Sequence, residues 1–454
     1  MTGVAPDRLN ALLKREAGRF VDSHPRSREL HERAQRSLVG GVPMQWMVEW
    51  AGAFPVFAKE ASGARIVDVD GNEYLDFCLG DTGAMFGHAP EPVAAAVAEQ
   101  ARRGLTFMLP TEDSIFVAEE LARRFGLPFW QMAMTATDAN RFVLRLAREL
   151  TGRPKILVFE GCYHGTVDET IATLRDGVVM SRVGNIGPQV DPRETTRVVE
   201  FNDLEALDRT LAEGDVACVL AEPAMTNHSG IVLPDPGYHQ GLRETTRRHG
   251  VLLIIDETHT ISSGPGGYTA LHGLEPDMLT IGKPLAGGVP VAVYGMSQEV
   301  GEKVRRRTAL PHCAVAGIGG TLTANALALH AMRVNLEEVM TGGNYARMIP
   351  LAERLADGVR HAIAACGLPW YVTQIGARVE YRFQPLPPRN GTEALQGVDR
   401  ELDRLIHLYF LNRGILVTPF HNMLLISPET TADDVDRHNA VFATCADALT
   451  GRAA

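Results

Sequence analysis

Three polar residues that could take part in catalysis directly follow apolar runs of the chain. Glu222 follows the run ACVLA, Asp256 ends VLLIID, and Lys283 comes just after DMLTIG. If these runs are parallel strands, their carboxyl ends share one sheet edge, where the ligands of open α/β sheets gather. Taken singly, each residue has a structural alternative, because acidic side chains at strand ends often cap turns and most lysines are solvated.

Together, Asp256 and Lys283 suggest a pyridine cofactor that serves as an electron sink. Such a cofactor needs an anionic partner at its ring nitrogen and a lysine amine to hold its aldehyde. Burial beside a cationic cofactor would promote loss of the lysine's proton, as a nucleophile requires. The apolar run before Lys283 and the segment PLAGGVP after it predict a buried, tightly turned lysine.

A phosphate-binding helix start is indicated by the segment MTATDANRF. It places Thr135 and Thr137 directly before the amphipathic stretch NRFVLRLAREL. Free backbone N–H groups at a helix N-terminus bind anions. A plain helix cap built from the same Thr and Asp side chains is the alternative, and the spacing alone leaves both open.

The elements that must position these residues form an α/β fold with a mainly parallel sheet. From about residue 85, amphipathic stretches such as EPVAAAVAEQARR alternate with short apolar runs. This alternation is typical of repeated βα units around a buried sheet. We therefore expect a large cofactor-binding domain over residues 85–335.

The two ends of the chain are expected to form a smaller α+β part. Residues 1–84 combine a helical start with a β-hairpin around the turn-forming pair Asp70-Gly71. Residues 336–454 show strands near 378–384 and 422–427, followed by a closing helix. We expect this C-terminal small domain to pack with the N-terminal segment.

Composition excludes several classes of partner and site. A chain of 454 residues exceeds the size of one hydrophobic core, and its net charge of −11 offers no basic field for nucleic acid or an anionic membrane. The six cysteines are scattered, without the spacing of a disulfide framework or a metal site. No signal peptide or membrane-spanning run is found, which predicts a cytoplasmic location.

The order of short motifs resembles that of class III, fold-type I aminotransferases, which use pyridoxal 5′-phosphate. The likeness extends from about residue 37 to 440 and is closest to the glutamate-1-semialdehyde aminomutase group. It rests on VGGV (39–42), VDVDGNEYLDF (67–77), PTE (110–112), GCYHG (161–165), AEP (221–223), IIDE (254–257), GKP (282–284) and GGT (319–321).

The resemblance implies roles for five residues near the cofactor ring. Lys283 would be the lysine that carries the cofactor as a Schiff base, and Asp256 the partner of the pyridine nitrogen. Tyr163 would stack on the ring, and Glu222 would have a supporting role. His259 stands where relatives carry Gln or Met, so it is expected near the phenolic oxygen, with a packed histidine as the alternative.

The resemblance also implies a shared site in a homodimer. Ala136 and Thr137 stand where the family has its phosphate-binding Gly-Thr. Alanine tolerates a positive φ less well than glycine, so a slightly shifted loop is expected with phosphate binding retained. Thr321 matches the threonine that reaches the phosphate from the neighbouring subunit.

The walls that face the substrate depart from the family pattern. The arginines that grip a substrate carboxylate in relatives are missing from GGVPMQWMVEW and from TPFHNM. Only the guanidinium fork matches both carboxylate oxygens, so other side chains replace it poorly. We expect an apolar substrate pocket instead, with core packing as the alternative. Its members would be Trp46, Met47, Met85, Phe86 and His421.

The sequence therefore predicts a ping-pong transaminase for a hydrophobic amine or amino acid and a carbonyl acceptor. Lys283 would move the proton between the substrate carbon and the cofactor. If a carboxylate proves to be required, Arg378 is the candidate clamp. The alternatives are a glutamate-1-semialdehyde-type aminomutase, an aminotransferase for β- or D-amino acids, and a cofactor-binding protein without catalysis.

Overall fold

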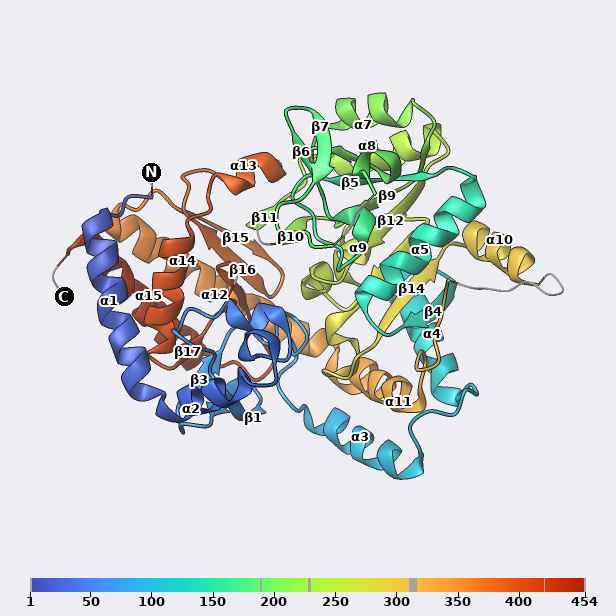
Figure 1. Cartoon of the computed structure of the whole chain (residues 1–454). Helices are drawn as coiled ribbons and strands as arrows, with labels where there is room; N and C mark the ends of the chain where they lie inside the picture. Colours follow the sequence, from blue (N-terminus) through green and yellow to red (C-terminus); the bar gives the residue numbers. More distant parts are fainter. Residues whose placement is uncertain (1, 188–189, 228–229, 310–316, 420, 453–454) are drawn as a thin grey trace. The chain divides into compact units, whose positions relative to one another are not determined.

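The computed structural model describes residues 2–187, 190–227, 230–309, 317–419 and 421–452 (Figure 1). The chain divides into two compact units. The small unit comprises Met1–Pro90, Gly343–Pro387 and Gln396–Ala454. The large unit comprises Glu91–Gly342 and Pro388–Leu395, and it contains both Asp256 and Lys283.

The large unit is built on a seven-stranded sheet, in the order β4-β14-β13-β12-β9-β5-β8. Neighbouring strands pair in parallel from β13 to β8, whereas β14 runs antiparallel to both of its neighbours. The expected mainly parallel α/β fold is confirmed. The strands are β4 (Phe129–Ala133), β5 (Lys155–Phe159), β8 (Thr196–Val199), β9 (Val216–Ala221), β12 (Leu252–Asp256), β13 (Met278–Ile281) and β14 (Ala292–Met296).

Helices cover both faces of this sheet, which explains why its central strands read as unbroken apolar runs. Ile156 and Val158 of β5 pack in one core cluster with residues of α5, while Leu157 and Phe159 pack in another with α7 and α8. The helices are α3 (Glu91–Arg103), α4 (Glu112–Phe125), α5 (Ala136–Thr151), α6 (Pro192–Thr195), α7 (Leu204–Leu211), α8 (Tyr238–Arg248), α9 (Gly267–Leu271), α10 (Gln298–Thr308), α11 (Ala326–Val334) and α13 (Gly391–Leu395).

Short elements complete the large unit and carry several of the candidate residues. Two antiparallel ribbons pair β6 with β7 and β10 with β11. Short helical turns follow β12 and β13, at the sheet edge where the sequence predicts the site. These elements are β6 (Ala172–Arg175), β7 (Val178–Ser181), β10 (Met225–Asn227), β11 (Gly230–Val232), η3 (Asp168–Thr170), η4 (Thr260–Ser263), η5 (Lys283–Ala286) and the π-helical turn η6 (Asn335–Val339).

The small unit holds two sheets and five helices of the described chain. One sheet has the order β1-β2-β3-β17, and the other β15-β16-β18. Its strands are β1 (Ala58–Ser62), β2 (Arg65–Asp68), β3 (Glu73–Asp76), β15 (Tyr371–Ile375), β16 (Arg378–Arg382), β17 (Ile415–Leu416) and β18 (Met423–Leu425). Its helical elements are α1 (Pro6–Ser23), α2 (Pro25–Ala34), α12 (Gly342–Cys366), α14 (Arg400–Leu411), α15 (Ala432–Thr450), η1 (Val39–Gly41) and η2 (Gln45–Val48).

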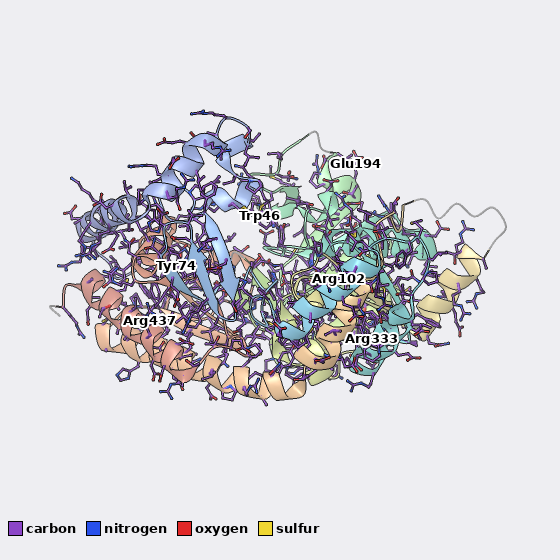
Figure 2. All side chains as sticks on the ribbon, turned by 90° about the horizontal axis from the view of Figure 1, so that it is seen from below. Trp46, Tyr74, Arg102, Glu194, Arg333 and Arg437 are labelled. Carbon is purple, nitrogen blue, oxygen red and sulfur yellow. The ribbon has the colours of Figure 1, made fainter. Side chains whose placement is uncertain are left out.

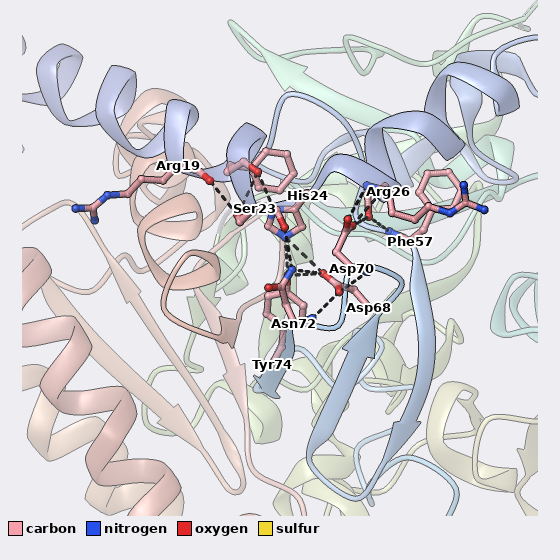
Figure 3. Close-up of polar contacts among 11 residues, drawn as sticks. Arg19, Ser23, His24, Arg26, Phe57, Asp68, Asp70, Asn72 and Tyr74 are labelled. Carbon is pink, nitrogen blue, oxygen red and sulfur yellow. Dashed lines mark hydrogen bonds and ion pairs between the residues drawn. The ribbon is translucent and has the colours of Figure 1, made fainter.

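A buried polar network ties the N-terminal helices to the hairpin β2–β3 (Figure 3). The Tyr74 hydroxyl donates to Asp68 Oδ2 at 2.8 Å, and His24 Nε2 lies 2.6 Å from the same hydroxyl. Burial and the Asp68 carboxylate raise the pKa of Tyr74, which therefore stays a neutral donor. Beside the turn, Asp70 accepts from the backbone N–H and the hydroxyl of Ser27.

One short segment of the C-terminal region packs with the large unit. The sequence places residues 388–395 in a domain of residues 336–454, whereas the structure groups them with Glu91–Gly342. A Cβ on Gly391 would lie only 2.0 Å from the carbonyl oxygen of Glu160, so this backbone approach requires a glycine. The Thr392 hydroxyl also donates to Glu200 Oε1.

Within the described ranges, no helix combines the length and apolar character needed to cross a membrane. The same residues contain no group of three or more histidine, cysteine or acidic side chains that could hold a metal ion.

Candidate active site

Lys283 lies in a fixed turn directly after β13. Its φ of 54° is in the left-handed region, which few residues other than glycine adopt and which costs about 1 kcal/mol. The turn is held on both sides: Gly282 N–H donates to Thr258 Oγ1 at 3.2 Å, and Asn335 donates from Nδ2 to the carbonyls of the two residues after Lys283. Backbone strain of this kind clusters at functional sites. The fold thus presents the half-buried lysine in one defined position.

His259 contacts the amino group of Lys283. Its Nε2 lies 2.5 Å from Lys283 Nζ, and its Nδ1 lies 2.9 Å from the hydroxyl of Thr226 in β10. That hydroxyl donates to Glu222 Oε2 at 2.5 Å, and Asn227 donates from Nδ2 to the other carboxylate oxygen. A continuous line of polar contacts therefore runs from Glu222 after β9 to Lys283 after β13.

Asp256, the last residue of β12, is held in a buried set of donors. Its side chain accepts from Asn140 Nδ2 and from His164 Nδ1, each at 2.9 Å on Oδ2, and from the Thr258 N–H at 3.1 Å on Oδ1. Asn140 is oriented in turn, because the Thr280 hydroxyl donates to its Oδ1 at 2.7 Å. The exposed fraction of Asp256 is only 3%.

Asp256 and His164 form a buried ion pair. Burial raises the pKa of the Asp256 carboxyl, but the hydrogen bond and charge of His164, together with the hydrogen bonds to Thr258 and Asn140, outweigh that effect and lower it. Burial likewise opposes the charge on His164, while Cys162 and Asp256 raise its pKa well above the ordinary histidine value. Asp256 is therefore a stable anion, as a group must be if it is to keep a pyridine nitrogen protonated.

This ion pair should make stability depend on pH in a defined window. Because the pKa of His164 is raised in the folded state, its contribution to stability is fully present when the pH is below 6.5, the ordinary histidine pKa. That contribution is lost as the pH rises toward the pKa of His164 in the folded protein. Because the pKa of Asp256 is lowered in the folded state, its contribution to stability is present when the pH is above 3.8, the ordinary aspartate pKa. That contribution is lost as the pH falls. We expect the free energy of unfolding of wild type minus that of His164→Asn to be largest between these values.

Urea unfolding from pH 4.5 to 8.5 measures this difference. Above pH 6.5 it should shrink by at most about 1.4 kcal/mol per pH unit, because one proton is linked to unfolding there. His249→Asn is the matched control, since His249 pairs with Asp208 at a partly exposed position. A wild-type advantage over His164→Asn that grows toward pH 8.5 would contradict the ion pair.

The start of α5 lies against Gly282 and Gly165, the chain neighbours of Lys283 and His164. A Cβ on Gly282 would be 2.9 Å from Ala136 Cβ, and one on Gly165 would be 2.2 Å from Thr137 Oγ1. Two glycines therefore let neighbouring backbone approach the first turn of the helix closely. The Thr135 hydroxyl accepts from the N–H of the third helical residue, so the helix cap that the spacing left open as the alternative is present. The N–H groups of Ala136 and Thr137 precede the first intrahelical bond and remain suited to an anion.

The large unit thus brings most of the predicted cofactor residues together. Lys283, His259 and Glu222 are joined by hydrogen bonds through Thr226, and Asp256 is joined to α5 through Asn140. The carbonyl of Tyr163 accepts from Asn227 Nδ2 at 3.4 Å, which places Tyr163 beside the same network.

Thr321 has no described contact with these residues. It is exposed and follows residues 310–316, which lie outside the described ranges. Its predicted contact with a phosphate of a neighbouring subunit stays a prediction.

The five predicted substrate residues all belong to the small unit. Trp46 and Met47 lie in η2, with exposed fractions of 42% and 39%, and Trp46 is marked in Figure 2. Met85 and Phe86 are buried, and Phe86 packs edge to face on Tyr345 with ring centroids 5.5 Å apart. Phe86 therefore packs in the core of its own unit, which is the alternative that the sequence leaves open for it. A role of these residues at the substrate stays a prediction.

His421 and Arg378 take part in a buried polar layer of the same unit. His421 Nδ1 lies 2.9 Å from Glu380 Oε1, and Arg378 donates from NH2 to the Thr82 hydroxyl at 2.6 Å. Arg378 and Glu380 are on one face of β16, because strand residues two apart point the same way. These contacts give both predicted residues a structural role in the small unit.

Three residues that organise the site are not evident from the sequence. His164 lies inside the GCYHG motif, where the resemblance implies a role only for the tyrosine. Asn140 looks like an ordinary polar residue of a surface helix, although it follows Ala136 by one helical turn and so faces the same way. Thr226 carries no local signal, because only the ribbon β10–β11 brings it between Glu222 and His259.

Comparison with known proteins agrees with this geometry. The family described as "Aminotransferase class-III" matches residues 47–438. The chain belongs to the class III aminotransferases. Glutamate-1-semialdehyde 2,1-aminomutase 2 of Brevibacillus brevis is 34% identical over 91% of this chain and 96% of its own length.

Solved structures of the family extend the likeness. A glutamate-1-semialdehyde aminomutase from Pseudomonas aeruginosa PAO1 shares 52% identity, with a TM-score of 0.96 over 98% of this chain and all of that one. An omega-transaminase from Sphaerobacter thermophilus shares 29% identity, with a TM-score of 0.84 over 93% of this chain and 98% of that one.

Membership of the family settles the enzyme class and the cofactor. The protein is a class III enzyme that uses pyridoxal 5′-phosphate, as the motifs predict. The residues of the site fit that group. They are an anionic Asp256 oriented by three hydrogen-bond donors, a lysine in a fixed turn, and a helix start approached by two glycines. Its substrates are small amino and carbonyl compounds.

Proposed function

We propose that the protein is an aminomutase of the glutamate-1-semialdehyde type, the function named as an alternative in the sequence analysis. The observation that carries the proposal is the likeness to aminomutases over nearly the whole chain, at 34% identity to a curated enzyme and 52% to a solved one. This likeness favours the aminomutase over the hydrophobic-amine transaminase that the missing arginines suggest. The reaction would move an amino group from carbon 2 to carbon 1 of one substrate.

In this proposal each residue of the site has one task. When bound, the cofactor would supply an electron sink and an exchangeable amino group. Asp256 holds a proton at the ring nitrogen, and the Lys283 amine takes and returns the proton at the substrate carbon. The N–H groups of Ala136 and Thr137 orient the phosphate, and Tyr163 covers the ring.

A homodimer with shared sites is part of the proposal. It is supported by the exposure of Thr321 and of an apolar run in the large unit that comprises Leu105, Phe107, Met108 and Leu109. Met108 and Leu109 are each 72% exposed, and adjacent apolar residues this exposed are a feature of interfaces. Sedimentation of the purified enzyme measures the oligomeric state directly.

A transaminase acting on a hydrophobic amine is the second candidate. It is favoured by the segment GGVPMQWMVEW, which has no arginine to bind a substrate carboxylate, and by the likeness to an omega-transaminase. The two candidates differ in whether a separate carbonyl acceptor is needed, because an aminomutase keeps its amino group within one substrate.

The test is an incubation of the holoenzyme with glutamate 1-semialdehyde and no other carbonyl compound. We expect conversion to the isomer with the amino group on the terminal carbon, and chromatography of the products measures this conversion. A parallel incubation with an aromatic amine and pyruvate tests the second candidate. Turnover only in that second mixture would replace the aminomutase proposal with the transaminase.

A further inference from the structure

The polar line from Glu222 to Lys283 has a single hydrogen-bonding direction. A carboxylate only accepts, and both oxygens of Glu222 receive donors, from Thr226 and from Asn227. A threonine hydroxyl has one proton, and Thr226 uses it on Glu222. The 2.9 Å contact between Thr226 Oγ1 and His259 Nδ1 therefore requires that His259 be the donor.

The direction of these bonds selects one tautomer of His259. With the ring proton on Nδ1, a neutral imidazole has a lone pair on Nε2. Nε2 is the atom that lies 2.5 Å from Lys283 Nζ. His259 is 8% exposed, and Thr226 is fully buried. Solvent therefore has little access to this arrangement, and it does not depend on flexible surface groups.

We propose that His259 is the proton acceptor of the Lys283 amino group, with Thr226 and Glu222 as the residues that position it. This inference rests on the proposed function only in that Lys283 is the reacting lysine. In the step, an N–H bond of the Lys283 ammonium breaks and an N–H bond forms on His259 Nε2. The products are a neutral amine with a free electron pair and an imidazolium, so charge and protons balance.

Glu222 stabilises the positive charge that this step moves from Lys283 to His259. Its Oε2 lies 3.7 Å from His259 Nδ1, near enough to stabilise an imidazolium in a buried setting. The arrangement has the logic of a catalytic triad, in which an acidic group fixes the tautomer of a histidine that serves a nucleophile. Here the nucleophile is a lysine, and a threonine hydroxyl stands between the acid and the histidine.

The placement differs from the role that the sequence suggests for His259. A histidine that donates from Nε2 to the cofactor's phenolic oxygen would need its proton on that atom, whereas Thr226 holds the proton on Nδ1. The two roles thus predict opposite tautomers of one ring.

Nitrogen NMR of the holoenzyme labelled with ¹⁵N-histidine distinguishes these tautomers without any turnover. The His259→Gln variant identifies the resonance by its disappearance. We expect Nδ1 to be protonated and Nε2 unprotonated in wild type at neutral pH. A protonated Nε2 beside an unprotonated Nδ1 would overturn the inference.

Two variants of Thr226 test the effect on Lys283. Thr226→Val keeps the shape and removes the hydroxyl, and Thr226→Ser keeps the hydroxyl. The readout is the rate at which hydroxylamine displaces Lys283 from the cofactor in the holoenzyme, measured by absorbance. In this reaction the proton moves in the reverse direction: His259 Nε2 takes it from the attacking hydroxylamine nitrogen and returns it to the leaving Lys283 nitrogen. We expect Thr226→Val to be slower than wild type by at least about tenfold, a part of the effect usual for an acid–base group, and Thr226→Ser to remain within about twofold.

Equal displacement rates in wild type and Thr226→Val would contradict the proposal, as would a Thr226→Ser variant as slow as Thr226→Val. Circular dichroism and the cofactor-to-protein ratio show whether each variant is folded and loaded. If Thr226→Val does not fold, the tautomer measured in wild type still decides the question. Failure of the aminomutase proposal would appear as absent isomerisation and would leave both of these readouts unchanged.

Discussion

Replacing Lys283 with alanine is expected to abolish turnover and the covalent attachment of the cofactor. The lysine amine is the only group in the proposed mechanism that both holds the cofactor and moves the substrate proton, so one substitution removes two functions. We expect a loss of at least about 10⁴-fold in the rate, the upper end of what an acid–base group contributes. The absorbance of the linked cofactor and its fixation by borohydride should disappear together.

Lys303→Ala is the matched control for this variant. Lys303 is exposed on α10 of the same unit and pairs with Glu299 at 2.6 Å. Exposed pairs of this kind contribute little, so the control should keep activity, linkage and stability. If Lys283→Ala still formed a borohydride-reducible linkage, another lysine would have to carry the cofactor.

The sheet was predictable because its central strands are covered on both faces. Residues such as those of β9 have no solvent face, so the run ACVLA stands out from the amphipathic helices around it. The direction of a strand has no such signal, so the sequence does not show that β14, between β4 and β13, is antiparallel to both. Nor does composition show that residues 388–395 leave the C-terminal region, since that depends on the close approach of Gly391 to Glu160.

Only those residues of the candidate site could be predicted whose type is unusual for their position at the end of a strand. Asp256 and Lys283 follow apolar runs and have side chains unusual for such places. Asn140 and Thr226 have no unusual sequence neighbours. Only the fold brings them to Asp256 and His259. The absence of arginines predicts a hydrophobic amine as substrate, whereas the likeness to relatives over 91% and 98% of the chain is the basis for proposing an aminomutase.

Asp256→Asn should lower the rate of amino transfer by at least about a hundredfold while the cofactor stays attached. Asparagine keeps the size and can still accept the N–H of Thr258, but it has no charge to keep the ring nitrogen protonated. One preorganised electrostatic group is typically worth this much in rate. Because Lys283 is unchanged, the borohydride-reducible linkage should form at full occupancy, which separates a chemical defect from loss of the cofactor.

The same substitution should also destabilise the protein. It leaves His164 without its carboxylate in a buried position, and breaking a buried pair costs about 3–5 kcal/mol. Asp208→Asn is the control, since Asp208 is partly exposed in α7 and pairs with Arg248 and His249. The double variant Asp256→Asn, His164→Asn should recover part of the lost stability and none of the lost rate. Recovery of the rate would mean that the ion pair serves folding alone and that the ring nitrogen has another partner.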